Sequence, residues 1–406
     1  MALGLDYSCF LIGMSFASAA TILPAFAAHL GASNVTIGAI PAVLTLGWFL
    51  PSLFAAHYTE RLSRKLPFVL RYTIWERVSL PLLAGVAWFV AGPFPGLALV
   101  LLFGLLLVMT TTGGALMPAW MDIVGRAIPT TLRGRFFGAA NVTASAGGLL
   151  GSTLTAWLLS AFPPPRSYGL CFLSGSGFVV LSYFALARVR EPHGAVTSEP
   201  QSLAAYLRRM PGLLRRDRNL RWFLIARGVG TLGGGMATGF YTVYALRGFG
   251  AAEWQVGAFT TLVLAGQVVG NLGFGWLADR AGHRAVLVLG LATLTACNVL
   301  ALCAGSARGL EPVFLLVGVH FASLHISART ILLELAGDVS ERPTYIGLGN
   351  TMLAPLTFSA PIVGGLMADQ VGFPIVFGLA AALSAIGLAL LVALVHEPRR
   401  LRRSAI

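Results

Sequence analysis

The chain alternates between long apolar runs and short polar segments in which arginine is common. A helix that crosses the hydrocarbon core of a bilayer needs about 20 mainly apolar residues. Twelve runs of about this length, with few internal charges, can be counted. The pattern therefore predicts an all-α integral membrane protein with twelve transmembrane helices. The predicted spans cover residues 7–30, 36–58, 67–91, 96–124, 136–162, 168–187, 222–246, 254–278, 285–304, 312–336, 344–369 and 373–395.

The composition agrees with this pattern. Of the 406 residues, 56% are hydrophobic and 11% are charged, whereas a soluble domain has about 25% charged residues. The formal net charge of +13 could suggest a nucleic-acid partner. We expect none, because the basic residues lie in short segments between apolar runs and form no single soluble face. The lipid bilayer is the predicted surrounding.

Cofactor and metal chemistry have no signature in the sequence. The four cysteines all lie inside apolar runs, without the spacing or the histidine neighbours of a metal site, and we interpret them as small packing residues. The nucleotide-binding pattern G-x-x-x-x-G-K-[ST] is absent as well. We therefore expect no metal, no cofactor and no ATP-driven step.

The distribution of basic residues predicts the topology. With the N-terminus inside the cell, the outer segments hold only Arg166, Arg247 and Arg308, and the remaining polar-segment arginines and Lys65 fall on the inner side. By the positive-inside rule, both termini are then cytoplasmic. The arginine-rich segment 188–221 is predicted to be a cytoplasmic linker that lies along the membrane surface.

The two halves of the chain repeat each other. Gly47 pairs with Gly266 and Lys65 pairs with Arg284, both 219 residues apart. The sixth and twelfth runs end alike, in VREP (189–192) and VHEP (395–398). The repeat predicts an N-terminal six-helix bundle over residues 1–187, the linker 188–221, a C-terminal bundle over 222–396 and a tail over 397–406.

The stretch 275–284 reads GWLADRAGHR and lies between the eighth and ninth runs. It resembles the loop signature G-x-x-x-D-R-x-G-R-R/K of the major facilitator superfamily (MFS), with His283 as the departure. The resemblance to twelve-span bacterial members implies two pseudo-symmetric six-helix bundles. It also implies a cytoplasmic latch that holds the outward-open state, although a plain positive-inside turn is the alternative. The latch residues are Gly275, Asp279, Arg280, Gly282 and Arg284, with a degenerate first copy at Glu60, Arg61, Arg64 and Lys65.

Ionisable residues inside predicted spans are functional candidates, because each costs about 3 kcal/mol or more at the bilayer centre. Glu76 and Arg77 lie in the third span, where we expect them to pair with other helices as a structural brace or as a coupling site. Asp122 and Glu334 end the fourth and tenth spans, so we interpret them as partners at an inner gate.

The resemblance also implies a central cavity lined by the first, fourth, seventh and tenth spans. In the tenth span, His325 and Arg329 are four residues apart and share one helix face. Arg329 favours an anionic or polyhydroxylated solute; alternatively, it pairs with Glu334, Asp122 or Glu76 and braces the inner gate. His320 is as easily a bonded interface residue as a ligand. The candidate cavity residues are His320, His325, Arg329, Thr111 and Tyr241.

We therefore predict a secondary active transporter and not an enzyme. It would move a small-molecule substrate across the cytoplasmic (inner) membrane of a bacterium by alternating access between two halves. A proton or another cation is the candidate co-transported ion, and a monomer is the expected state. The alternatives are a multidrug or metabolite efflux antiporter of the same fold and a transporter-like membrane sensor.

Overall fold

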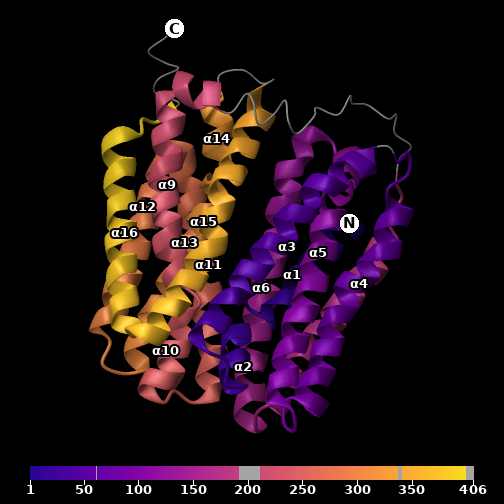
Figure 1. Ribbon diagram of the computed structural model, residues 1–406. Coiled ribbons are helices and arrows are strands. Elements are labelled where there is room, and N and C mark those ends of the chain that lie inside the picture. Colours follow the sequence, from indigo (N-terminus) through magenta and orange to yellow (C-terminus); the bar gives the residue numbers. More distant parts are fainter. Residues whose placement is uncertain (61, 192–210, 337–340, 399–406) are drawn as a thin grey trace. The chain divides into compact units, whose positions relative to one another are not determined.

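The computed structural model describes residues 1–60, 62–191, 211–336 and 341–398. Within these ranges the regular structure is entirely helical. The chain divides into two compact units. The first comprises Met1–Pro200 and Ala252–Thr261, and the second comprises Gln201–Ala251 and Leu262–Ile406. Figure 1 shows the long helices that make up each unit.

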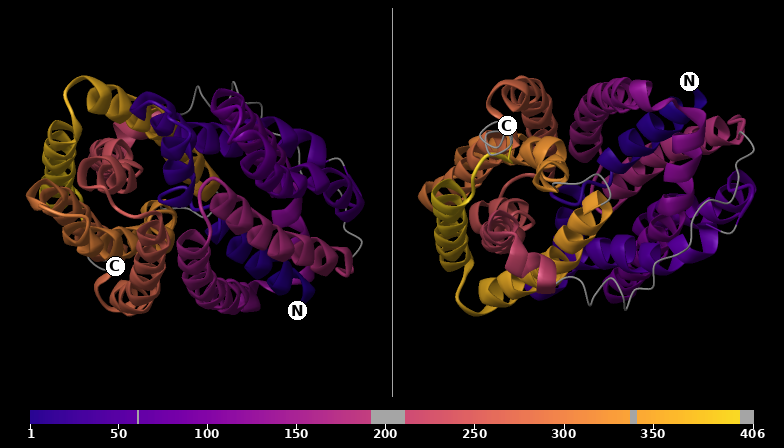
Figure 2. Two further views of the ribbon diagram at one scale, coloured as in Figure 1. Left: turned by 90° about the horizontal axis from the view of Figure 1, so that it is seen from below. Right: turned by 90° about the horizontal axis from the view of Figure 1, so that it is seen from above.

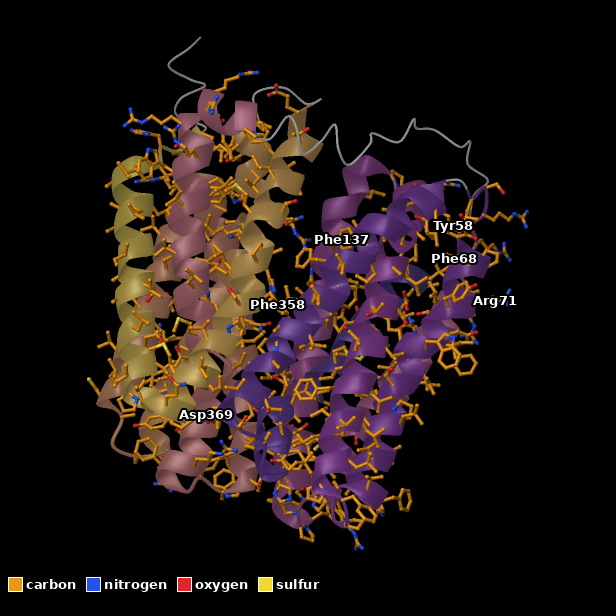
Figure 3. All side chains as sticks on the ribbon, in the orientation of Figure 1. Tyr58, Phe68, Arg71, Phe137, Phe358 and Asp369 are labelled. Carbon is orange, nitrogen blue, oxygen red and sulfur yellow. The ribbon has the colours of Figure 1, made fainter. Side chains whose placement is uncertain are left out.

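The first unit is a bundle built from the N-terminal half of the chain. Helix α1 packs between α6 and α7, α3 packs along α5, and α4 packs against α5 and α7. Figure 3 shows how Tyr58 of α3 and Phe68 of α4 meet, with ring centroids 5.6 Å apart. The elements are α1 (Ala2–Ser15), α2 (Ile22–His29), α3 (Asn34–Glu60), α4 (Leu66–Gly85) with the π-helical turn η1 (Val86–Val90), α5 (Pro95–Ala127), α6 (Thr130–Ala161) and α7 (Arg166–Ala187).

The second unit repeats this plan. Helix α9 packs against α15 and α16, and α12 packs against α13 and α16. Figure 2 shows the helices of this unit end-on. The start of α11, Ala252–Thr261, belongs to the first unit. The elements are α9 (Arg218–Ala237), α10 (Phe240–Phe249), α11 (Glu253–Ala281), α12 (His283–Cys303), the 3₁₀ turn η2 (Arg308–Leu310), α13 (Glu311–Ser327), α14 (Thr330–Leu335), α15 (Arg342–Gln370) and α16 (Phe373–Leu394).

The architecture agrees with the predicted twelve-helix fold, with one difference in how three spans are built. Ten helical segments of the described chain are long and apolar enough to cross a membrane. The first and seventh predicted spans are each formed by two shorter helices, α1 with α2 and α9 with α10. The tenth is also interrupted, between Ser327 and Thr330. Hydropathy does not show such breaks, because each is short and the run around it remains apolar on average, even where Arg329 follows Ala328.

Glycines at matching positions of the repeat permit close helix contact in both units. A Cβ atom on Gly47 of α3 would lie 2.0 Å from Thr110 Oγ1 on α5. A Cβ atom on Gly266 of α11 would lie 2.0 Å from the Leu315 carbonyl oxygen on α13. Packing of backbones across small residues is how helices associate in lipid. The 219-residue repeat therefore extends from sequence to packing.

Three of the segments expected between predicted spans are helical in part, which corrects the sequence interpretation. Helix α11 continues through Ala281, and Gly282 alone links it to α12. Gly282 has φ 89° and ψ 168°, a conformation that is essentially restricted to glycine. Helices α6 and α15 likewise begin inside expected loops, at Thr130 and Arg342. The reason is that hydropathy marks the edge of the membrane, whereas a helix can continue into water.

Part of the predicted organisation lies outside the described residues. This applies to Arg61, to residues 192–210 of the linker and to residues 399–406 of the tail. The described end of the linker leads into α9, where the Asp217 carboxylate accepts a hydrogen bond from the Leu220 N–H at 2.9 Å. Asp217 is thus the N-cap of α9.

Candidate functional site

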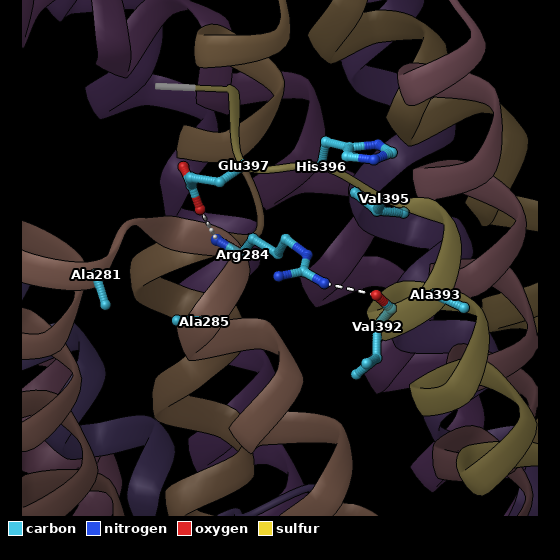
Figure 4. A pocket seen from close by; sticks show the side chains of 8 residues that line it. All are labelled: Ala281, Arg284, Ala285, Val392, Ala393, Val395, His396 and Glu397. Atoms are coloured by element: carbon cyan, nitrogen blue, oxygen red, sulfur yellow. Dashed lines mark hydrogen bonds between the residues drawn. The ribbon is translucent and has the colours of Figure 1, made fainter. Parts of the chain in front are cut away.

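At the start of α12, the carboxylate of Glu397 near the C-terminus accepts a hydrogen bond from the last residue of the stretch 275–284. The Arg284 N–H donates to Glu397 Oε2 at 3.1 Å, and Arg284 Nη2 donates to the Val392 carbonyl oxygen at 2.6 Å (Figure 4). A Cβ atom on Gly282 would lie 2.3 Å from Glu397 Cδ. A carboxylate is favoured there by the helix dipole and the free N–H groups. The motif thereby fastens the start of α12 to the end of α16.

The first unit contains the equivalent contact. The Glu191 carboxylate accepts hydrogen bonds from the N–H groups of Lys65 at 2.9 Å and Leu66 at 2.8 Å, where α4 begins. Glu191 and Glu397 hold the same position in the VREP and VHEP segments. Sequence reasoning used these segments as evidence of a repeat but did not assign the glutamates a role. The signal was available, since a glutamate recurs at the same place in both halves.

Two predicted gate residues of the first unit are brought together beside this cap. Lys65 Nζ lies 2.7 Å from Asp122 Oδ2, and Arg126 Nε lies 2.6 Å from the same oxygen. Arg126 Nη1 also approaches Glu191 Oε1 at 3.8 Å. The Lys65 side chain is buried although it is charged. These four groups join the ends of α4, α5 and α7 into one polar network.

The remaining latch residues are more exposed. Asp279 and Arg280 lie on the last turn of α11, where the Arg280 guanidinium stacks over the Trp276 ring at 4.2 Å. A Cβ atom on Gly275 would meet no other atom within 4 Å, so no helix approaches closely there in this structure. Arg64 is exposed at the end of the first-unit turn. The side chains of Glu60 and Arg61 lie outside the described part of the chain.

His283, the departure from the family pattern, bonds to the interrupted tenth span. His283 Nδ1 lies 3.0 Å from Ser327 Oγ, and His283 Nε2 lies 3.8 Å from Glu334 Oε1. Ser327 ends α13 and Glu334 lies on α14, so His283 contacts both sides of the interruption. Glu334, expected at an inner gate, thus has a neighbour inside its own unit.

Two arginines lie at the interruption of the tenth span. Arg227 of α9 donates from Nη1 to the Ala328 carbonyl oxygen at 2.9 Å, and its buried Nε has no hydrogen-bond partner in the described chain. Arg329 interacts electrostatically with Arg227 and with His325. Arg329 and His325 are exposed, and among the described residues no carboxylate pairs with Arg329. The expected bracing partners Glu334, Asp122 and Glu76 are all engaged by other groups.

The other candidate cavity residues differ in accessibility. His320 is buried, with Nδ1 2.8 Å from the Gly290 carbonyl oxygen. Tyr241 is fully buried, donates to Asn298 Oδ1 at 2.7 Å and stacks on Phe377. Thr111 is exposed on α5. His320 and Tyr241 are therefore interior residues of the second unit, and this placement favours a structural role for both.

In the first unit, the expected partner of Arg77 on another helix is Asp6. Arg77 Nη2 lies 2.9 Å from Asp6 Oδ1, and Ser182 and Trp120 also donate to this carboxylate. Glu76 lies on the other side of the guanidinium, 3.4 Å from Nη1. Asp6 was not a sequence-predicted site residue, because the predicted first span began one residue after it. An acidic residue next to an apolar run was the available signal.

The comparison with known families decides the identity. A family model described as the Major Facilitator Superfamily matches residues 7–252 and 223–405. The chain belongs to the Major Facilitator Superfamily. Proteins of this superfamily are transporters and generally not enzymes, so the chain is a multi-pass membrane protein of the secondary transporter class. No curated protein sequence matches it significantly.

Solved structures of the superfamily share the fold. The nucleoside transporter NupG is 15% identical with a TM-score of 0.74, and the match covers 97% of this chain and 99% of NupG. A D-xylose–proton symporter is 13% identical with a TM-score of 0.71, covering 98% of both chains. The inward-open xylose transporter XylE from E. coli is 11% identical with a TM-score of 0.71, covering 98% and 97%. These similarities establish the shared architecture.

Proposed function

We propose that this superfamily member moves a small anionic solute by alternating access between its two halves. The observation that carries the proposal is the pair Arg227 and Arg329 at the interruption of the tenth span. A guanidinium at membrane depth needs a counter-charge, water or an anionic ligand. Within the described chain neither arginine has a carboxylate partner, so a solute carboxylate or phosphate supplies the missing charge.

The interrupted helices support a binding site in this region. Helices that break near mid-membrane commonly form the substrate and ion sites of secondary transporters. Here the first, seventh and tenth spans are discontinuous, and Arg227 and Arg329 belong to the seventh and tenth. His325 lies one helical turn from Arg329 and provides a hydrogen-bonding group beside the charge.

The helix ends around Glu191 and Glu397 form the proposed latch. Each glutamate connects the last helix of a unit to the turn that carries the family motif or its first-half copy. Asp279 and Arg280 are exposed on that turn, and we propose that they contact other parts of the protein in another conformation. We place this face in the cytoplasm of a bacterium, because the basic segments concentrate there.

Ligand binding to the purified monomer tests the substrate class. A bound solute stabilises a protein by RT ln(1 + [L]/Kd), about 2.7 kcal/mol at one hundred times Kd. Small carboxylates and phosphate esters should raise the melting temperature, whereas neutral sugars and nucleosides should not. The shift should shrink in Arg329→Lys, which keeps the charge but loses the planar fork. Arg308→Lys is the matched control, because Arg308 lies just before α13 begins, at the end of this helix opposite to Arg329. Stabilisation by neutral solutes alone would contradict the anionic assignment.

A further inference from the structure

The first unit contains a buried ionic cluster with one more carboxyl group than guanidinium. Asp6 of α1, Glu76 and Arg77 of α4 are 3%, 7% and 8% exposed. Arg77 lies between the two carboxyl groups, with Asp6 Oδ1 at 2.9 Å and Glu76 Oε2 at 3.4 Å. If both acids were ionised, the cluster would carry a net negative charge inside a membrane bundle, where an uncompensated charge is costly.

The hydrogen bonds around the two acids favour Asp6 as the ionised one. Asp6 Oδ1 accepts from Arg77 at 2.9 Å and from Ser182 at 2.6 Å, and Asp6 Oδ2 accepts from Trp120 Nε1 at 2.9 Å. Both oxygens of Asp6 act only as acceptors, and one donor is a guanidinium. Three donors of this kind favour the carboxylate form. Asp6 and Arg77 therefore form the charged pair of the cluster.

Glu76 is held by weaker donors. Its Oε2 accepts from the Thr73 hydroxyl at 3.0 Å and receives the longer contact from Arg77. Its Oε1 points toward Gly113 of α5, where a Cβ atom would lie 2.5 Å away. Among the described residues, Oε1 accepts no hydrogen bond that would hold a charge. A neutral carboxylic acid fits this surrounding better than a carboxylate.

Among the described residues, no cation other than Arg77 compensates Glu76. On α4 itself, Arg71 is exposed and points away from the bundle beside Tyr72 (Figure 3). Helix α5 carries Asp122 and Arg126, which form an ion pair with each other, and Asp122 also pairs with Lys65. Helix α7, which packs against α1 and α4, carries Arg166 at its opposite end. Among the described side chains, Arg77 is thus the only cation beside Glu76, and its guanidinium lies closer to Asp6.

From this geometry we infer that Glu76 is a proton-binding site, and that it binds the proton that the transporter co-transports. In the arrangement that the structure shows, Glu76 is a carboxylic acid, and the charge of Arg77 neutralises that of Asp6. A movement that separates Arg77 from Asp6 and exposes the Asp6 carboxylate to water would let the guanidinium pair with Glu76. The proton of Glu76 would then be released to water, and water in place of Arg77 would solvate the charge of Asp6. This exchange between two carboxylates for one guanidinium couples protonation to helix movement. The coupling part rests on the proposed transport function; the protonation itself does not.

Infrared spectroscopy of the purified protein tests protonation without any solute. The wild type should show the carbonyl band of a buried carboxylic acid near neutral pH, and Glu76→Gln should remove it. Asp6→Asn should also remove it, because Arg77 is then free to pair with Glu76. Glu311→Gln, an exposed acid at the start of α13, is the control and should leave the band intact. A wild-type spectrum without the band, or a band that survives Glu76→Gln, would overturn the inference.

Flux measurements in proteoliposomes test the coupling. Glu76→Gln imitates the protonated acid, so solute exchange at equal concentrations should stay within a few-fold of wild type. Accumulation driven by a proton gradient should be lost. Wild-type accumulation in Glu76→Gln would overturn the coupling while leaving the transport function in place. A wild type that carries no solute at all would instead contradict the proposed function, and the infrared result would still decide whether Glu76 binds a proton.

Discussion

Glu397 accepts a hydrogen bond from the backbone N–H of Arg284, across 113 positions of the sequence and at 3.1 Å. Glu191 makes the equivalent contact with the backbone N–H of Lys65 at 2.9 Å. A carboxylate thus caps the N-terminus of the third and ninth spans. In each half, this carboxylate belongs to a residue just after the last span of that half. The motif that identifies the superfamily is completed by residues that lie outside it.

Removal of this cap should weaken the second unit. Glu397→Ala leaves the Arg284 N–H without its charged acceptor, which costs about 1.5–3 kcal/mol for a hydrogen bond to a charged group. Glu397→Gln keeps an acceptor and should lose less, about 0.3–1 kcal/mol from the charge at the helix dipole. Thermal unfolding in detergent would measure both. Equal melting temperatures for all three proteins would show that the carboxylate contributes nothing to stability.

The two motif glycines should respond differently to alanine. Gly282→Ala forces a side chain into a glycine-only conformation and onto Glu397, at a cost of about 1–3 kcal/mol for the backbone alone. Gly275→Ala lies in open space within α11 and should be neutral or stabilise by up to about 1 kcal/mol. Melting temperatures of the two variants should therefore move apart. A larger loss for Gly275→Ala would contradict the described packing.

The repeat predicts the same sensitivity at Gly47 and Gly266. Alanine at either position would meet a neighbouring helix at 2.0 Å and push it aside, so each variant should lose about 1–3 kcal/mol. Gly104 of α5 and Gly273 of α11 have no atom within 4 Å of an added Cβ and are the matched controls. Yields of monodisperse protein and melting temperatures give the comparison. Stable Gly47→Ala and Gly266→Ala proteins would indicate that these helices tolerate separation.

Membrane orientation can be read by cysteine labelling. Cys303 is exposed and must first be replaced by serine. In that background, Ser63→Cys should react with a membrane-impermeant reagent only after permeabilisation, because the basic segments favour the inside. Ser306→Cys, also at an exposed position, should react in intact cells. The reverse pattern would invert the topology and place the motif face outside.

Sequence patterning predicted the number, type and order of the spans because a bilayer imposes a length and a polarity on every crossing helix. It could not place the interruptions at Thr238 and Ala328, since each is too short to change the average hydropathy of its run. It recognised Arg77 and Glu76 as anomalous but not Asp6, whose contact with Arg77 joins residues 71 positions apart. It also assigned His320 and Tyr241 to the cavity, because the sequence alone does not show which face of a helix is buried in its own bundle.

Solute flux that depends on Arg329 is the most direct consequence of the proposed function. Proteoliposomes should take up a labelled carboxylate or phosphate ester, chosen because it stabilises the purified protein. Arg329→Gln should lower the initial rate at low solute concentration at least tenfold, since it removes about 1.5–3 kcal/mol of charged hydrogen bonding. Arg308→Gln should transport as the wild type does. Binding without uptake by the wild type would indicate a sensor, and uptake that is unchanged in Arg329→Gln would contradict the proposed site.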